Sequence, residues 1–250
     1  SVVTWKIAVS QELAPQVMVF GSVATGYKGY AYDIVTGFNP ARIDASLSGT
    51  APGLTGVGAI RPETSTSYEL GLKSRFFDNR VQFNLIGFTT DYKNFQAQSV
   101  ITVNNAPQFV LNNVGKLKTK GIELEFSAKP SDWLRIDAGA SYTDAVMTSF
   151  VGAQGYPGQT GATWNGTASV LSAPCITAPA ATALAPRTTC QFQDRSGQRL
   201  PNSPKFKWNL GATAEFPVAE DVEATMLLGY QHQSAVHFDL LGNPLLAQGA

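Results

Sequence analysis

The sequence has few charged residues, only two cysteines and no long hydrophobic run, and each shortage excludes a class of protein. Asp, Glu, Lys and Arg make up 14% of the 250 residues, against about 25% in ordinary soluble domains. Eighteen acidic residues balance eighteen Lys plus Arg, so no basic field points to nucleic acid as a partner. No stretch of about 18 or more apolar residues occurs, which excludes a transmembrane helix.

Catalytic and metal-binding motifs are also missing. The sequence has no Gly-rich phosphate loop, no nucleophile elbow and no zinc-type cluster of cysteines. His232 and His237 are five residues apart, so a regular strand turns them to opposite sides, which makes a poor metal site. We therefore expect no enzyme activity, no catalytic residue, no metal ligand and no cofactor.

The two cysteines, Cys175 and Cys190, lie in a segment rich in Pro, Ala and Thr and enclose fourteen residues. A disulfide between them would remove on the order of 3 kcal/mol of unfolded-state entropy. It would also suit an oxidising, external compartment. We predict this disulfide; two unrelated loop thiols are the alternative.

Eight segments alternate between apolar and polar residues over about ten or more positions, whereas soluble strands average about five or six. We predict antiparallel strands at Thr4–Leu13, Val17–Tyr27, Thr64–Phe77, Val81–Gln96, Lys116–Lys129, Trp133–Met147, Pro204–Val218 and Val222–Leu240. The connections alternate between tight turns at 14–16, 78–80, 130–132 and 219–221 and long segments at 28–63, 97–115 and 148–203. Short turns at one end and long loops at the other are typical of transmembrane β-barrels.

The alternation predicts one face toward lipid and one toward water. In Lys116–Lys129, Leu124 and Phe126 share one face while Glu123 and Glu125 share the other. A charge facing the centre of the membrane would cost about 2–4 kcal/mol, and the apolar faces carry none over their central portions. Phe206 and Phe216 bracket one such face; ten residues of tilted strand span roughly 25 Å, the height of a barrel's apolar band.

Two predicted strands are less regular. In Val81–Gln96 the apolar residues change parity after Leu85, which a bulge near Gly87 would explain. In Val17–Tyr27 both faces are fairly apolar, so the sequence leaves its register unassigned.

Three blocks resemble the barrels of TonB-dependent receptors. The run RPETSTSYELGLKS at Arg61–Ser74 resembles the family's strand-opening signature and continues in its manner to Lys93. Asn113-Val114-Gly115-Lys116, followed by KGIELE at Lys120–Glu125, is similar to another of its strands, and Ala24–Lys28 to a recurring strand end. Together the blocks cover most of Ser22–Ala145, and the remainder agrees by its hairpin pattern only.

The resemblance implies that residues 1–250 form about eight strands of a 22-stranded antiparallel transmembrane β-barrel in the bacterial outer membrane. We expect the plug domain, the last barrel strands and the N-terminal box that contacts TonB to lie outside this sequence. The implied function is energised uptake of a scarce ligand such as an iron-siderophore, a vitamin or an oligosaccharide, with this segment supplying wall and extracellular loops.

Candidate site residues follow from this arrangement. For a small-molecule ligand, the long connections offer aromatic and charged side chains: Tyr27, Tyr30, Tyr32, Arg42, Phe109, Tyr156 and Trp164. Facing the lumen or the plug, and forming cross-strand ion pairs there, we expect Glu69, Lys73, Arg75, Glu123, Glu125, Arg135 and Asp137. On the outward parity, above the apolar stretch, Lys116, Lys118 and Lys120 would meet lipopolysaccharide phosphates or be solvated. Self-packing of the loops, and solvated lumen charges without partners, are the alternatives.

Two other protein classes fit parts of the pattern. A passive pore, or a small self-contained outer-membrane barrel with adhesive or binding loops, would show the same turns and faces. A soluble lectin-like β-sandwich would also alternate with period two.

Overall fold

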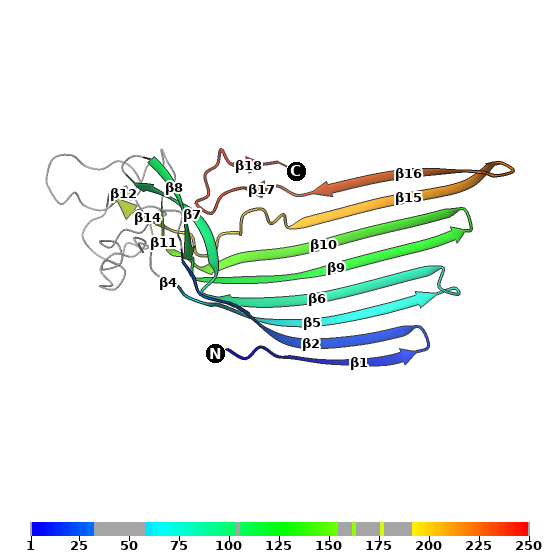
Figure 1. Cartoon of the computed structure of the whole chain (residues 1–250), viewed down its shortest axis with the longest axis horizontal. Helices are drawn as coiled ribbons and strands as arrows, with labels where there is room; N and C mark the ends of the chain where they lie inside the picture. The colour runs from blue at the N-terminus through cyan, green and yellow to red at the C-terminus, as the bar shows by residue number, and fades with distance from the viewer. Residues whose placement is uncertain are drawn as a thin grey trace.

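The computed structural model describes residues 2–32, 59–103, 106–154, 162–163, 176–177 and 192–249. Eight long strands form one antiparallel sheet in the order β1-β2-β5-β6-β9-β10-β15-β16 (Figure 1). Their bounds are β1 (Lys6–Ala14), β2 (Val17–Lys28), β5 (Glu63–Phe76), β6 (Val81–Lys93), β9 (Lys116–Ser131), β10 (Leu134–Ser149), β15 (Phe206–Ala219) and β16 (Val222–Gln233). The all-β prediction is confirmed. The sandwich alternative is wrong, because these strands form one sheet rather than two packed sheets.

The two ends of this sheet differ. Four tight turns lie at one end, and the described parts of the longer connections lie at the other (Figure 1). The shorter strands of the loop end are β3 (Ala31–Tyr32), β4 (Ala59–Ile60), β7 (Gln96–Val103), β8 (Ala106–Asn113), β11 (Val151–Gln154), β12 (Ala162–Thr163), β13 (Ile176–Thr177), β14 (Phe192–Asp194), β17 (Val236–His237) and β18 (Ala247–Gln248). The described residues include no helix of the length and apolarity needed to cross a bilayer.

The strand register gives the sheet an apolar face and a polar face. We call the face that carries Leu124 the outward face and the face that carries Glu125 the inward face. Directly paired across the outward face are Leu72, Leu85, Leu124, Ala140 and Trp208. Directly paired across the inward face are Lys73, Asn84, Glu125, Gly139 and Asn209. Alternate residues therefore meet different surroundings, as the sequence pattern predicts.

The bulge expected near Gly87 is absent. The pairing of β6 with β5 and with β9 runs through Gly87 without a register shift. Ile86 and Phe88 therefore lie on the inward face, where Phe88 is directly opposite Gly121 and a Cβ added to that glycine would meet the Phe88 ring. The parity change is instead a local apolar area on the inward face, in which an aromatic ring covers a glycine of the neighbouring strand.

The structure assigns one strand that the sequence left open and shortens another. The register assigns β2, which the sequence left open: Val19 pairs with Leu72 on the outward face, and Phe20 pairs with Gly71 on the inward face. The strand predicted to run to Leu240 ends instead at Gln233. Beyond it, β17 forms a short antiparallel pair with β18.

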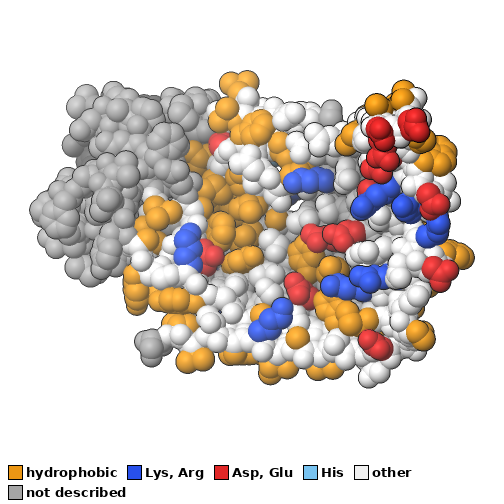
Figure 2. All heavy atoms as spheres, turned by 45° about the vertical axis from the view of Figure 1, so that its right-hand side comes forward, with side chains coloured by type: hydrophobic (Ala, Val, Ile, Leu, Met, Phe, Trp, Pro, Cys, Tyr) orange, Lys and Arg blue, Asp and Glu red, His pale blue; other side chains and the backbone are white. Residues whose placement is uncertain are grey.

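A small apolar core closes the inward face at the loop end. Its buried members are Val114, Leu117, Met147, Phe150 and Ala153, and the half-buried Tyr92, Phe95, Ala97, Leu200 and Leu240 pack against them. Leu117 pairs with both Tyr92 and Met147, so three neighbouring strands supply this core at the same level. Figure 2 shows a corresponding group of hydrophobic side chains toward the loop end, and interspersed acidic and basic side chains toward the turns.

At the turn end, an exposed ion pair links two neighbouring hairpins. Arg80 Nη2 donates to Asp132 Oδ1 at 2.8 Å. Both side chains are largely exposed, and such pairs contribute about 0–1 kcal/mol. The turn end is therefore held mainly by the backbone pairing of its hairpins.

Candidate functional site

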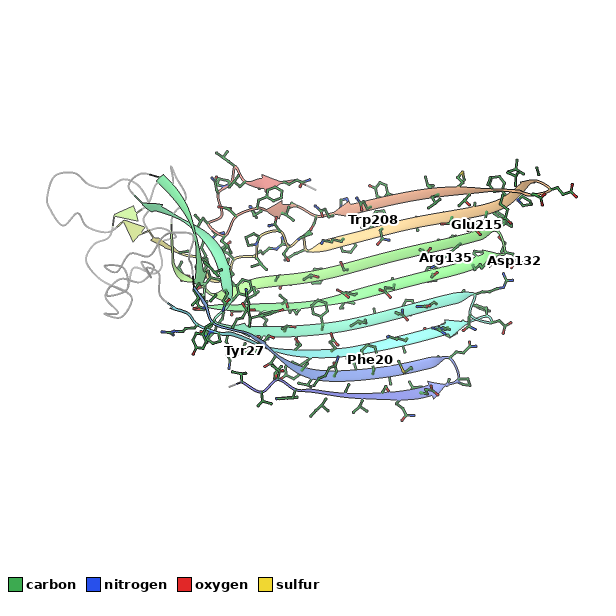
Figure 3. The ribbon with its side chains drawn as sticks, in the orientation of Figure 1. Phe20, Tyr27, Asp132, Arg135, Trp208 and Glu215 are labelled. Atoms are coloured by element: carbon green, nitrogen blue, oxygen red, sulfur yellow. The ribbon has the colours of Figure 1, made fainter. Side chains whose placement is uncertain are left out.

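The charged residues expected to face the lumen share the inward face. Lys73 and Glu125 lie on either side of Asn84, and Arg75 and Ser127 on either side of Gln82. Asp137 follows in register opposite Ser127. Figure 3 places Arg135 and Glu215 toward the turn end of this wall. By the same register, Glu69 and Glu123 are on this face as well.

Two of these carboxylates accept hydrogen bonds from neutral side chains of the neighbouring strand. Ser22 Oγ donates to Glu69 Oε2 at 3.2 Å, and Asn84 Nδ2 donates to Glu125 Oε2 at 3.1 Å. The ammonium group of Lys73 lies 5.4 Å from the centre of the Phe20 ring.

The expectation of cross-strand ion pairs on this face is wrong for the described residues. The inward ion pair that they contain joins Arg135 and Asp137 along a single strand, at 2.9 Å. The register explains this, because each inward carboxylate of the central strands faces Ser, Asn, Gly or an apolar residue rather than a cation.

A network of side-chain amides joins the bases of several long connections. Gln96, 4% exposed, donates from Nε2 to the carbonyl oxygens of Gly29 and Arg61, both at 2.9 Å. Its backbone N–H donates to Glu63 Oε2 at 2.8 Å. Asn94 Nδ2 reaches the carbonyl oxygen of Pro62 at 3.2 Å. One buried glutamine therefore ties together the ends of β2, β5 and β6.

Asn113 and Gly115 complete this loop base. Asn113 accepts a hydrogen bond from the Arg61 N–H at 2.7 Å and donates to the carbonyl oxygens of Arg61 and Asn94. Gly115 has φ +99°, and a Cβ there would meet the backbone carbonyl of Ser149. These contacts give a physical reason for the Asn-x-Gly motif and for the Arg61–Glu63 segment it holds.

Sequence reasoning did not assign the loop base to a role. Asn113, Gly115 and the segment Arg61–Glu63 stand within the motif blocks, so a signal for them was present. Gln96 gave none, because it stood only as the last residue of the strand predicted at Val81–Gln96.

The predicted ligand-binding residues lie at the loop end or outside the described residues. Tyr27 is the last residue but one of β2, on the outward parity and opposite Thr64 (Figure 3). Tyr30 is 67% exposed next to the loop base. Tyr32 and Phe109 belong to β3 and β8, respectively. Outside the described residues are Arg42, Tyr156, Trp164 and both cysteines, Cys175 and Cys190. Ligand binding by these residues and the disulfide stay predictions.

The outward face carries its own aromatic cluster. The rings of Trp208 and Tyr230, on adjacent strands, have centroids 5.0 Å apart, and His232 lies 6.1 Å from Trp208. Phe206 pairs with Tyr142 one row nearer to the loops. Rings with an apolar body and a polar tip suit a boundary between hydrocarbon and water. The wall thus combines a lipid-compatible exterior, a polar interior and firmly anchored loop bases.

The chain was compared with known protein families and structures. The model of a family described as "TonB dependent receptor-like, beta-barrel" matches residues 1–243. The chain is 32% identical over 89 residues to the probable TonB-dependent siderophore receptor PiuA of Acinetobacter baumannii, a match that covers 36% of this chain and 11% of that protein. It is 26% identical over 144 residues to a ferric-pyoverdine 358 receptor of Pseudomonas putida, covering 56% of this chain and 17% of the receptor.

Among solved structures, the ferric yersiniabactin uptake receptor FyuA from Yersinia pestis superimposes with a TM-score of 0.62 at 17% identity. That superposition covers 98% of this chain and 27% of FyuA. The likeness shows a shared strand arrangement. The chain thus spans only a fraction of each of these proteins.

Proposed function

The chain belongs to the family of TonB-dependent receptor β-barrels, and from this premise we propose that it forms the wall and extracellular loops of an active-transport receptor for a scarce metal chelate. Membership of the family places it in the bacterial outer membrane and among transporters rather than enzymes. The observation that carries the proposal is the two-faced sheet itself, apolar outside and polar inside, with long connections confined to one end.

Completion of the barrel is the first part of the proposal. Among the described residues, β1 pairs with β2 alone and β16 with β15 alone, and Figure 1 shows them at opposite edges of the sheet. An unpaired strand edge in hydrocarbon costs several kcal/mol for each unsatisfied backbone group. We propose that further strands of a 22-stranded barrel pair with both edges, in place of closure as a self-contained small barrel.

The inward face is proposed to meet a plug domain. Glu69, Glu123 and Glu125 present carboxylates that at most one neutral donor each engages among the described residues. Such groups retain acceptor capacity for backbone N–H groups or cations of a domain inside the barrel. Coupling of that plug to TonB, through an N-terminal box, is the proposed source of energy.

Among the three ligand classes that the resemblance implies, a ferric siderophore is the one we propose. The printed names of PiuA and of the pyoverdine receptor refer to a siderophore and to a ferric chelate, and their identities lie between 26% and 32%. The exposed Tyr30 beside the anchored loop base offers an aromatic contact for such a ligand.

Uptake of radiolabelled iron chelates by cells that express the full-length gene tests this proposal. The host would lack its other ferric receptors, and paired strains would carry or lack TonB. We expect accumulation only with TonB present, and a reduced apparent affinity in Tyr30→Ala. Equal uptake in both strains would instead support a passive pore and would overturn the proposal.

A further inference from the structure

A group of lysines lies on the outward face immediately beyond the apolar rows. Lys120 lies opposite Asp144, and Lys118 lies opposite Asp91. On the same face, two residues closer to the turns, Ile122 pairs with Gly87 and Tyr142. The lysines therefore begin one pairing step above the last apolar row, at the loop end of the wall.

The patch carries more positive than negative charge. We define it as Lys93, Lys116, Lys118, Lys120 and Lys205, together with Asp91 and Asp144. Lys118 Nζ is 3.3 Å from Asp91, while Lys120 and Lys205 share Asp144 at 3.8 and 3.9 Å. The side chains of Lys118, Lys120 and Lys205 are 43–60% exposed. Five lysines against two aspartates leave a surplus of three positive charges.

Two of these lysines occupy directly paired positions on adjacent strands. Lys93 and Lys116 are direct cross-strand partners at the end of β6 and the start of β9, and both are exposed. No carboxylate of the described residues lies within 4.0 Å of either ammonium group. Like charges directly opposite on adjacent strands destabilise the pair, so an external anion placed between them would relieve a cost built into the wall.

We propose that the patch binds the phosphate groups of lipopolysaccharide in the outer leaflet. This proposal rests on the proposed function only for the orientation of the loop end toward the cell exterior, which is the usual orientation of long loops. Ammonium groups bind phosphate as point charges. The patch continues the apolar rows directly, so a ligand with acyl chains below and phosphates above matches both parts, whereas free phosphate matches only the upper part.

Lipopolysaccharide binding to the purified, delipidated full-length receptor in detergent tests the proposal. The patch variant is Lys116→Gln/Lys118→Gln/Lys120→Gln. The control, Lys6→Gln/Lys28→Gln/Lys129→Gln, removes the same charge from exposed lysines elsewhere on the chain. Each lysine near an anionic lipid surface raises the affinity for that surface about fivefold. We therefore expect the patch variant to bind lipopolysaccharide on the order of 10- to 100-fold more weakly than the unmodified receptor. The control should bind it within about twofold of the unmodified receptor. Equal binding by the patch variant and the unmodified receptor would overturn the proposal.

Removal of a competing carboxylate gives a second, opposite readout. Asp91→Asn frees Lys118 and should strengthen lipopolysaccharide binding severalfold. Inorganic phosphate should fail to displace the lipid, and dephosphorylated lipid should bind weakly. Binding that is lost in Asp91→Asn/Asp144→Asn and in the presence of a chelator would mean that divalent cations bridge the aspartates to phosphate, which would overturn direct recognition by lysine.

Iron uptake measured on the same variants separates this proposal from the transport function. Lipopolysaccharide binding through these lysines in a receptor that imports no chelate would support the patch and overturn the transport proposal. Normal uptake in a receptor whose lysine variants bind lipopolysaccharide unchanged would do the reverse.

Discussion

The wall and the loop bases of this chain are stabilised in different ways. The wall consists of long strands in which the outward residues of the central rows, such as Leu72, Leu85 and Leu124, lie among apolar neighbours, so that no single side chain determines the register. The loop base depends on a few specific contacts, made by Gln96, Asn113 and Gly115. The comparison teaches that the wall is specified redundantly by a pattern, whereas the position of the loops is specified by individual residues.

The largest effect is expected from a charge placed on the lipid side of the wall. Leu124 lies in the middle of an outward apolar row, so Leu124→Arg should destabilise the barrel by about 2–4 kcal/mol. Unfolding by urea of the full-length receptor in lipid vesicles measures this. Glu123→Arg, one residue away on the inward face, is the matched control. A loss in the control as large as in Leu124→Arg would refute the assignment of the faces.

Gly115→Ala tests the loop base through the backbone. The positive φ and the close Ser149 carbonyl should make this change cost about 1–3 kcal/mol locally. Limited proteolysis in native membranes should then cut the adjoining loops faster. Gly229→Ala is the control, because a Cβ there meets nothing within 4 Å. If both variants are cut at the same rate, the strain assigned to Gly115 is wrong.

Asn113→Ala removes the side chain that bridges Arg61 and Asn94. Each lost bond at this partly exposed site contributes about 0.5–1.5 kcal/mol, and water will replace some of them. We expect a net loss of about 1–2 kcal/mol, detected as faster amide hydrogen exchange at Arg61 with unchanged exchange in β9. Asn209→Ala, at an exposed asparagine of the wall, should leave both regions unchanged. Exchange at Arg61 that stays slow would show that Gln96 alone holds this base.

The smallest effect is expected at the turn end. Asp132→Asn removes the charge that faces Arg80 across two hairpins and should change stability by about 0–1 kcal/mol. The same urea unfolding experiment measures it, at low and at moderate salt. A loss larger than that of Asn113→Ala would mean that the turns, rather than the loop bases, depend on single contacts.

The sequence predicted the wall well for a physical reason. Alternation over about ten positions assigns each side chain to a face regardless of the exact strand end. The segments between the eight alternating strands are then the connections, four of them tight and three of them long. The prediction failed where the inward face is locally apolar. The apolar residues of this strand change to the inward parity because the Phe88 ring covers Gly121, and the strand does not bulge. A linear pattern does not show which residue lies across the pair.

The candidate site was less predictable. Placement of the inward charges followed from parity, but their partners did not, since hydrogen bonds such as Asn84 to Glu125 depend on register between strands far apart in sequence. The loop base joins residues from Gly29 to Asn113. Such contacts arise only after the hairpins have paired, and a single sequence carries no direct signal of that pairing.

The uninterrupted register of β5, β6 and β9 has a consequence for biogenesis. A slip by one residue at either seam would rotate a whole strand and bring Glu123 and Glu125 into hydrocarbon. Carboxylates in hydrocarbon would raise the free energy of the misaligned sheet above that of the native one. The hydrocarbon of the membrane therefore favours the native strand alignment over a register slipped by one residue.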